Sequence, residues 1–131
     1  MTGRQARCSC GQLNLDIIGD PVRVSVCHCQ ECQRRTGSAF GVQARFDRAN
    51  VRITGQSTEY IRRGDSGLSI SFHFCPGCGT TVYWEFPGYP GVMSVAVGAF
   101  ADPAFPPPTV AVYESRQHSW VNLTGIQQRE T

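Results

Sequence analysis

The sequence contains no lysine, so its 12 basic residues are all arginines, and they give a formal net charge of only +2. So small an excess gives little support for nucleic-acid binding, and seven thiolates holding two zinc ions would remove it. No apolar run approaches the roughly 20 residues that a transmembrane helix needs. The first residues, MTGRQARCSCG, lack the apolar core of a signal peptide. We therefore expect a soluble, cytoplasmic protein that binds neither nucleic acid nor a membrane.

Charged residues are sparse as well, at 17%, whereas glycine and proline are plentiful, with 14 and 8 copies. This composition is typical of an ordered, turn-rich globular protein rather than a disordered one. A length of 131 residues suits one compact domain and leaves little room for a second. We expect a single domain over residues 1–131.

Apolar residues recur at every second position through most of the chain, as in Leu13, Leu15 and Ile17. This period is that of a β-strand with one buried face. Glycine, proline, asparagine or aspartate separates most of the alternating segments. The pattern predicts an all-β fold, with strands at 13–17, 22–26, 40–46, 51–53, around 60, 68–74, 80–86, 92–97 and 110–113.

Two segments depart from this alternation. The stretch QECQRRTG, residues 30–37, predicts a helix of about two turns that ends near Gly37, because glycine commonly caps a helix C-terminus. The stretch ADPAFPPPT, residues 101–109, is too rich in proline for a helix or a central strand, since proline lacks the backbone donor. We expect it to be a surface connection before the last strand.

The seven cysteines form three clusters, and an odd number cannot all pair in disulfides. In an intracellular protein such clusters indicate metal or thiol chemistry. The segment FCPGCGTT is a zinc knuckle, whose tight turn directs two thiolates at one point, and CSCG offers a second pair. Together they predict a closed, structural zinc site formed by Cys8, Cys10, Cys75 and Cys78.

A second assignment fits the spacing equally well. Cys29 and Cys32 also form a CxxC pair, and with Cys75 and Cys78 they would make a zinc ribbon. In either case four cysteines hold one metal and three remain. Three thiolates on zinc leave an open coordination position, as catalytic sites do. We favour Cys27, Cys29 and Cys32 as the open set, because one local turn supplies all three.

Histidines and arginines lie near these cysteines. His28 lies between two of them, and its side chain is expected to point away from the metal, as neighbours in an extended segment do. His73 and His118 are expected to be solvated or hydrogen-bonded. Arg34 and Arg35 follow Cys32 on the predicted helix, where one could reach an anionic substrate beside the metal and the other would face water.

The segments CSCG, CHCQECQRRTGSAF and FCPGCGTTVY, in this order and at roughly these spacings, resemble the glutathione-dependent formaldehyde-activating enzyme family, to which centromere protein V also looks related. The resemblance extends from Cys8 to about Trp120. It implies a β-tent of small antiparallel sheets organised around zinc. It also implies a structural zinc on Cys8, Cys10, Cys75 and Cys78 and a catalytic zinc on Cys27, Cys29 and Cys32.

Two functional hypotheses follow. The resemblance implies a carbon–sulfur lyase that forms S-(hydroxymethyl)glutathione from formaldehyde and glutathione, with two zinc ions per chain and glutathione as a possible co-substrate. The alternative is a non-catalytic, zinc-stabilised β module that binds a protein or a small thiol. A redox-sensing thiol switch is weaker, because clustered cysteines hold metal more readily than they await oxidation.

Overall fold

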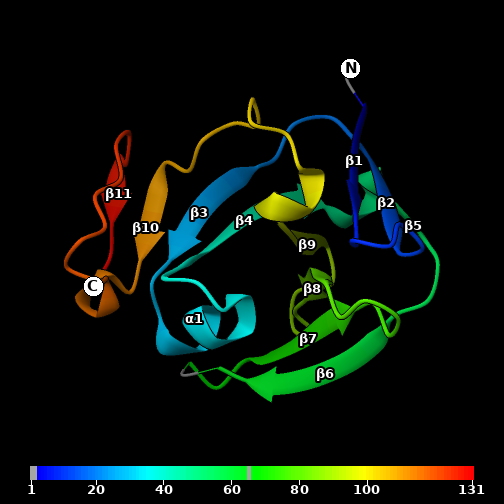
Figure 1. Ribbon diagram of the computed structural model, residues 1–131, viewed down its shortest axis with the longest axis horizontal. Helices are drawn as coiled ribbons and strands as arrows, with labels where there is room; N and C mark the ends of the chain where they lie inside the picture. The colour runs from blue at the N-terminus through cyan, green and yellow to red at the C-terminus, as the bar shows by residue number, and fades with distance from the viewer. Residues whose placement is uncertain (1–2, 65) are drawn as a thin grey trace.

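The computed structural model describes residues 3–64 and 66–131 and contains two β-sheets (Figure 1). The smaller sheet has the order β1-β2-β5, and the larger has the order β11-β10-β3-β4-β9-β8-β7-β6. The strands are β1 (Gly3–Arg7), β2 (Asn14–Ile18), β3 (Arg23–Cys27), β4 (Gly41–Asp47), β5 (Val51–Thr54), β6 (Thr58–Arg63), β7 (Ser69–Phe74), β8 (Thr81–Glu85), β9 (Val92–Ala96), β10 (Val110–Val112) and β11 (Gln128–Arg129). The predicted all-β class is confirmed.

Every alternating segment of the sequence is a strand, and the structure adds two strands that the alternation does not mark. These are β1, whose sequence GRQAR buries only Ala6, and the two-residue β11. Strand β10 pairs parallel with both β3 and β11, whereas the other described pairings are antiparallel. The described residues also form three short 3-10 helices, η1 (Arg48–Asn50), η2 (Val97–Phe100) and η3 (Glu114–Arg116).

The predicted short helix is α1 (Gln30–Thr36). It begins at Cys29, whose side chain accepts a hydrogen bond from the backbone N–H of Cys32. It ends at Gly37, which has φ of 66° and donates its N–H to the carbonyl of Gln33 at 2.8 Å. Glycine adopts this left-handed conformation without the steric penalty of a Cβ. Within the described chain, no helix is both long and apolar enough to cross a membrane.

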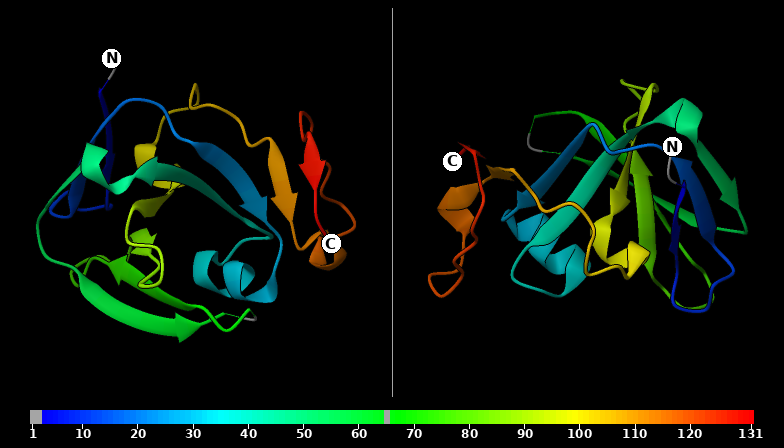
Figure 2. Two further views of the ribbon diagram at one scale, coloured as in Figure 1. Left: turned by 180° about the vertical axis from the view of Figure 1, so that it is seen from behind. Right: turned by 90° about the horizontal axis from the view of Figure 1, so that it is seen from above.

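The two faces of the large sheet have different surroundings. Phe46, Met93 and Val95 lie on one face and pack with Leu15 and Ile17 of the small sheet to form the core. The large sheet is strongly bent, and α1 lies inside the bend, between β3–β4 and β6–β7 (Figures 1 and 2). Because successive strand residues point to opposite faces, the polar residues of β3 and β4 lie on the side of α1.

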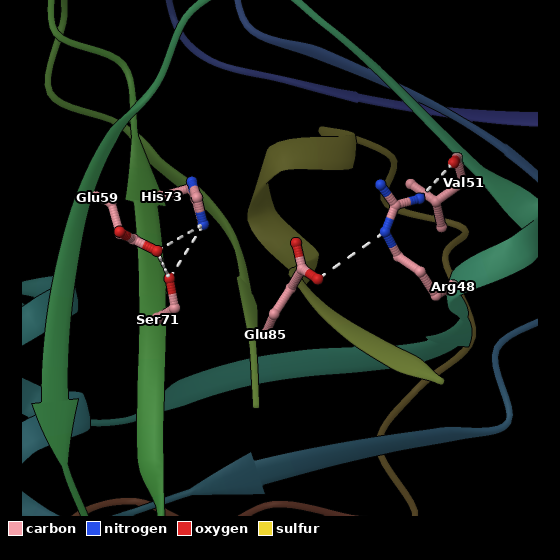
Figure 3. A network of polar contacts seen from close by, with 6 residues as sticks. All are labelled: Arg48, Val51, Glu59, Ser71, His73 and Glu85. Carbon is pink, nitrogen blue, oxygen red and sulfur yellow. Dashed lines mark hydrogen bonds and ion pairs between the residues drawn. The ribbon is translucent and has the colours of Figure 1, made fainter. Parts of the chain in front are cut away.

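A polar network joins β6 and β7, the last two strands of the large sheet (Figure 3). His73 contacts the hydroxyl of Ser57 at 2.9 Å and that of Ser71 at 3.1 Å, and its ring stacks on Tyr83 with centroids 4.5 Å apart. The hydroxyl of Ser71 also donates to Glu59 of β6. His73 is therefore hydrogen-bonded on the face of β7 opposite Phe72, as the sequence indicates.

Gly55, between β5 and β6, packs closely against Gln12, between β1 and β2, and provides a test of how tightly these two loops are packed. It has φ of +94°, and a Cβ there would lie 1.9 Å from the carbonyl oxygen of Gln12. We expect Gly55→Ala to lower the free energy of unfolding, measured with denaturant, by about 1–3 kcal/mol more than Gly125→Ala does. Gly125 is the matched control because it has φ of +80° with no atom within 4 Å of the added Cβ. Equal losses in the two variants would contradict this expectation.

Candidate metal centre and adjoining pocket

Four cysteines from two distant turns meet at one point. The sulfur atoms of Cys8, Cys10, Cys75 and Cys78 all lie within 4.8 Å of one another. The first two residues lie in the β1–β2 connection and the other two in the β7–β8 connection. The Cys8 and Cys10 sulfurs are 3.6 Å apart, and those of Cys10 and Cys75 are 3.7 Å apart. This cluster therefore joins the small sheet to the large one.

Neighbouring groups of this cluster donate hydrogen bonds to its sulfurs. The side-chain amide of Gln12 donates to Cys75 at 3.0 Å and lowers the pKa of that thiol. The hydroxyl of Thr80, 3.3 Å from the Cys78 sulfur, lowers the pKa of Cys78 to about 5. The pKa of Cys10 shifts in the other direction. A hydrogen bond with the backbone of Gln12 lowers this pKa, but hydrogen bonds with the neighbouring thiols outweigh it and raise the pKa of Cys10 to about 11. Donors of this kind favour thiolate, the form that binds metal.

The remaining three cysteines form a local cluster at the junction of β3 and α1. Cys27 ends β3, Cys29 caps α1 and Cys32 lies in the first turn of α1. Their sulfurs lie within 4.8 Å of one another, and no fourth histidine, cysteine or acidic residue of the described chain joins them. Cys29 and Cys32 thus lie together with Cys27 and not with Cys75 and Cys78, so the ribbon arrangement is not formed.

The three thiols differ in acidity. Hydrogen bonds from Cys27 and then Cys32 lower the pKa of Cys29 to about 2. The bond to Cys29 raises the pKa of Cys27. The pKa of Cys32 is also raised. A hydrogen bond with Cys27 lowers this pKa, but the hydrogen bond with Cys29 and the burial of the thiol outweigh it. The hydrogen bonds among the three thiols therefore favour ionisation of Cys29 over that of its two neighbours.

The histidines near this cluster do not join it. His28 is fully buried, its ring meets Phe40 edge-on at 5.8 Å, and burial lowers its pKa. Neither ring nitrogen of His28 has a hydrogen-bond partner among residues 3–64 and 66–131. His118 is 2.9 Å from the side-chain oxygen of Gln33 and ties the segment after η3 to α1. His28 therefore points away from the three sulfurs, and His118 is hydrogen-bonded, as expected from the sequence.

A pocket of about 550 Å³ opens beside the three-cysteine cluster. This volume is within the range of small-molecule sites. Its apolar wall comes from β7, β8 and the turn that follows, and its polar floor comes from β3, β4 and β9. Wall residues include Ile70, Phe72, Trp84 and Phe86, and floor residues include Arg23, Ser25, Gln43, Arg45 and Ser94.

The two arginines that follow Cys32 have different environments, although both border the pocket. The Arg34 side chain is 71% exposed and forms an ion pair with Glu31 at 3.1 Å. The Arg35 guanidinium lies 4.3 Å from the ring centre of Trp84 and 5.8 Å from that of Phe72. Its Nη2 atom is buried and has no hydrogen-bond partner in the part of the chain that the structure describes. Arg35 is thus held against the aromatic wall of the pocket, whereas Arg34 is exposed and paired with Glu31.

Sequence reasoning did not identify four further arginines that border the pocket, Arg23, Arg45, Arg62 and Arg116. For two of them the sequence contains a signal. Val24 and Val26 are buried in the interior, so Arg23, Ser25 and Cys27 must share the other face of β3. The same alternation along β4 places Arg45 opposite the core residues Ala44 and Phe46.

Comparison with known proteins gives consistent findings. A Schizosaccharomyces pombe protein named as an uncharacterized lyase is 26% identical over 82 residues, a match that covers 63% of this chain and 57% of that relative's length. A crystal structure of a Rhodobacter sphaeroides protein has a TM-score of 0.57 at 20% identity, covers 79% of this chain and 91% of its own, and indicates likeness of fold alone. The family model described as glutathione-dependent formaldehyde-activating enzyme matches residues 3–116, which include all seven cysteines. This chain belongs to the glutathione-dependent formaldehyde-activating enzyme family.

Proposed function

We propose that this chain is a zinc-dependent carbon–sulfur lyase that acts on the adduct of a small thiol and an aldehyde, such as S-(hydroxymethyl)glutathione. The observation that carries the proposal is the position of Cys27, Cys29 and Cys32, three converging thiols that face a pocket and have no fourth ligand among the described residues. Membership of the family and a lyase-named relative support the same reaction class.

The donor atoms fit zinc. Four sulfurs bound at about 2.3 Å to a tetrahedral zinc lie about 3.8 Å apart. The separations of 3.6 and 3.7 Å in the four-cysteine cluster agree with this value. We infer a closed structural site there and an open one at Cys27, Cys29 and Cys32, which makes two zinc ions per chain.

Zinc at the open site would supply a Lewis-acid position for a substrate sulfur or aldehyde oxygen. In the synthetic direction the thiol sulfur forms a bond to the aldehyde carbon, and the thiol proton ends on the carbonyl oxygen. The chain's own residues orient and shield these groups. Phe72 and Trp84 exclude water from one side, and the positive charge of Arg35 partly offsets the contributions that raise the pKa of Cys32. The lyase reaction is the reverse, in which the carbon–sulfur bond breaks.

Cysteine variants separate a catalytic site from a second structural one. We expect the wild-type protein to hold two zinc ions and Cys29→Ser to hold one, because a site with two thiolates binds zinc weakly. Cys29→Ser should stay folded and lose glutathione-dependent consumption of formaldehyde. Cys75→Ser should unfold at a much lower denaturant concentration, because its zinc joins the two sheets. If Cys29→Ser unfolds as completely as Cys75→Ser, the enzyme proposal fails.

The two metal sites should also differ in their response to acid. In the open site two of the three thiols have raised pKa values and Cys29 has a lowered one, whereas in the closed site two of the four thiols have lowered values and Cys10 has a raised one. A thiol with a raised pKa binds its proton more tightly and so yields its metal at a higher pH. As the pH of the cobalt-substituted protein falls from about 7.5 to 5, we expect the open site to lose its metal first.

This loss is measured from the thiolate-to-cobalt absorption bands. Cys29→Ser, which keeps only the closed site, serves as the control and should show a single transition at the lower pH. Loss of the closed-site metal before the open-site metal would contradict the assignment of the two sites.

The open site itself is tested by titrating the cobalt-substituted protein with glutathione and other small thiols. A change in the cobalt bands with a thiol, absent in Cys29→Ser, is the expected result, because the thiol would occupy the open position. No change with any thiol would instead favour a non-catalytic, zinc-stabilised binding module.

A further inference from the structure

The pocket beside the three-cysteine cluster is strongly cationic. Among the described residues, six arginines border it, against one acidic side chain, Glu31, which is already paired with Arg34. The other five make no ion pair with an acidic side chain of the described chain. They are Arg23, Arg35, Arg45, Arg62 and Arg116. An open zinc site with three thiolates carries one net negative charge, so a single arginine would balance it and four would remain.

Two of these arginines lie side by side on the floor. Arg23 of β3 and Arg45 of β4 are direct cross-strand partners. Like charges in this position destabilise a sheet. Burial and the charge of Arg23 lower the pKa of Arg45. The Nε atom of Arg45 and the side-chain oxygen of Gln43 beside it are buried with no hydrogen-bond partner in the described chain. An anion over this floor would relieve the repulsion.

Aromatic rings hold the arginines of the wall. Arg35 lies over Trp84, and Arg62 lies 5.3 Å from the ring centre of Phe72. Gly41 makes room for Arg35, because a Cβ at that position would lie 2.7 Å from the Arg35 Nη2 atom. Stacking of this kind fixes a guanidinium plane while leaving its edge free to donate hydrogen bonds. The wall charges are therefore preorganised.

The three-cysteine cluster lies at one end of the pocket floor. Cys27, Ser25 and Arg23 are successive residues on one face of β3, and they pair with Gly41, Gln43 and Arg45 of β4. The rise of about 3.3 Å per strand residue separates the Cα atoms of Cys27 and Arg23 by about 13 Å. A small organic molecule with its sulfur at the cysteines can therefore place its other end among the arginines, whose long side chains shorten the span.

We infer that this pocket selects small thiols that carry a carboxylate, which Arg45 and Arg23 on the floor and Arg35 on the wall receive. The place of the sulfur rests on the proposed function, whereas anion binding by the arginines does not. A carboxylate has two oxygens in one plane and accepts two parallel hydrogen bonds from a guanidinium. Neutral and cationic thiols lack this contact and bind more weakly.

Sulfur-free acids test the arginines without relying on the metal chemistry. Trp84 borders the pocket, so its fluorescence reports binding once the exposed Trp120 is replaced in a Trp120→Phe background. In the zinc-loaded protein we expect succinate to bind at least about tenfold more tightly than the neutral succinamide. Arg45→Met should remove most of this preference. Arg63→Met is the control for lost charge, because Arg63 is exposed and lies outside the pocket.

Thiols of matched size test the complete inference. The cobalt bands should respond to mercaptosuccinate at a concentration at least about tenfold lower than to 2-mercaptoethanol or cysteamine, and Arg45→Met should weaken only the first. If all three thiols act alike and succinate does not bind, the inference is wrong while the proposed function stands. If succinate binds but no thiol changes the bands, the proposed function fails and the anion pocket remains. Tighter binding of inorganic phosphate than of succinate would overturn the preference for a carboxylate.

Discussion

The alternation of side chains along β3 and β4 is the constraint on which the rest of the structure depends. On one face, valines, Ala44 and Phe46 pack in the interior of the protein. On the other face the same strands carry Cys27 and two arginines into the pocket. A shift of one residue in either strand would exchange the faces, burying charge and exposing the core. The hydrophobic core thus fixes the register that also forms the site.

The two cysteine clusters depend on this framework in different ways. The four-cysteine cluster joins turns that are more than 60 residues apart, so its formation requires both sheets. The three-cysteine cluster occupies six consecutive positions, and the cap of α1 alone brings its sulfurs together. The long-range cluster is accordingly suited to holding the fold, whereas the local one can leave a coordination position for a substrate.

Much of the fold could be predicted from the sequence, because its signals are local: alternation for strands and Gly37 for the end of α1. The spacing of the cysteines left a ribbon arrangement open, and the family resemblance favoured the two groups that the structure forms. β1 was missed because GRQAR has one buried residue, so no alternation of apolar residues marks it. The arginine floor was missed because it depends on which strands are neighbours. Arg23 and Arg45 are 22 positions apart, and only the pairing of β3 with β4 brings them together. The difference between Arg34 and Arg35 required the position of Trp84.

The pocket's cations are all guanidinium groups, and this has a chemical consequence for a protein of this family. A lysine amine condenses with aldehydes to form a Schiff base. A guanidinium stays protonated at all physiological pH values and is a poor nucleophile. Since the chain contains no lysine, an aldehyde that enters the pocket meets positive charge without meeting a side-chain amine. Arg35 and Arg45 can therefore attract an anion beside a reactive carbonyl without being consumed by it.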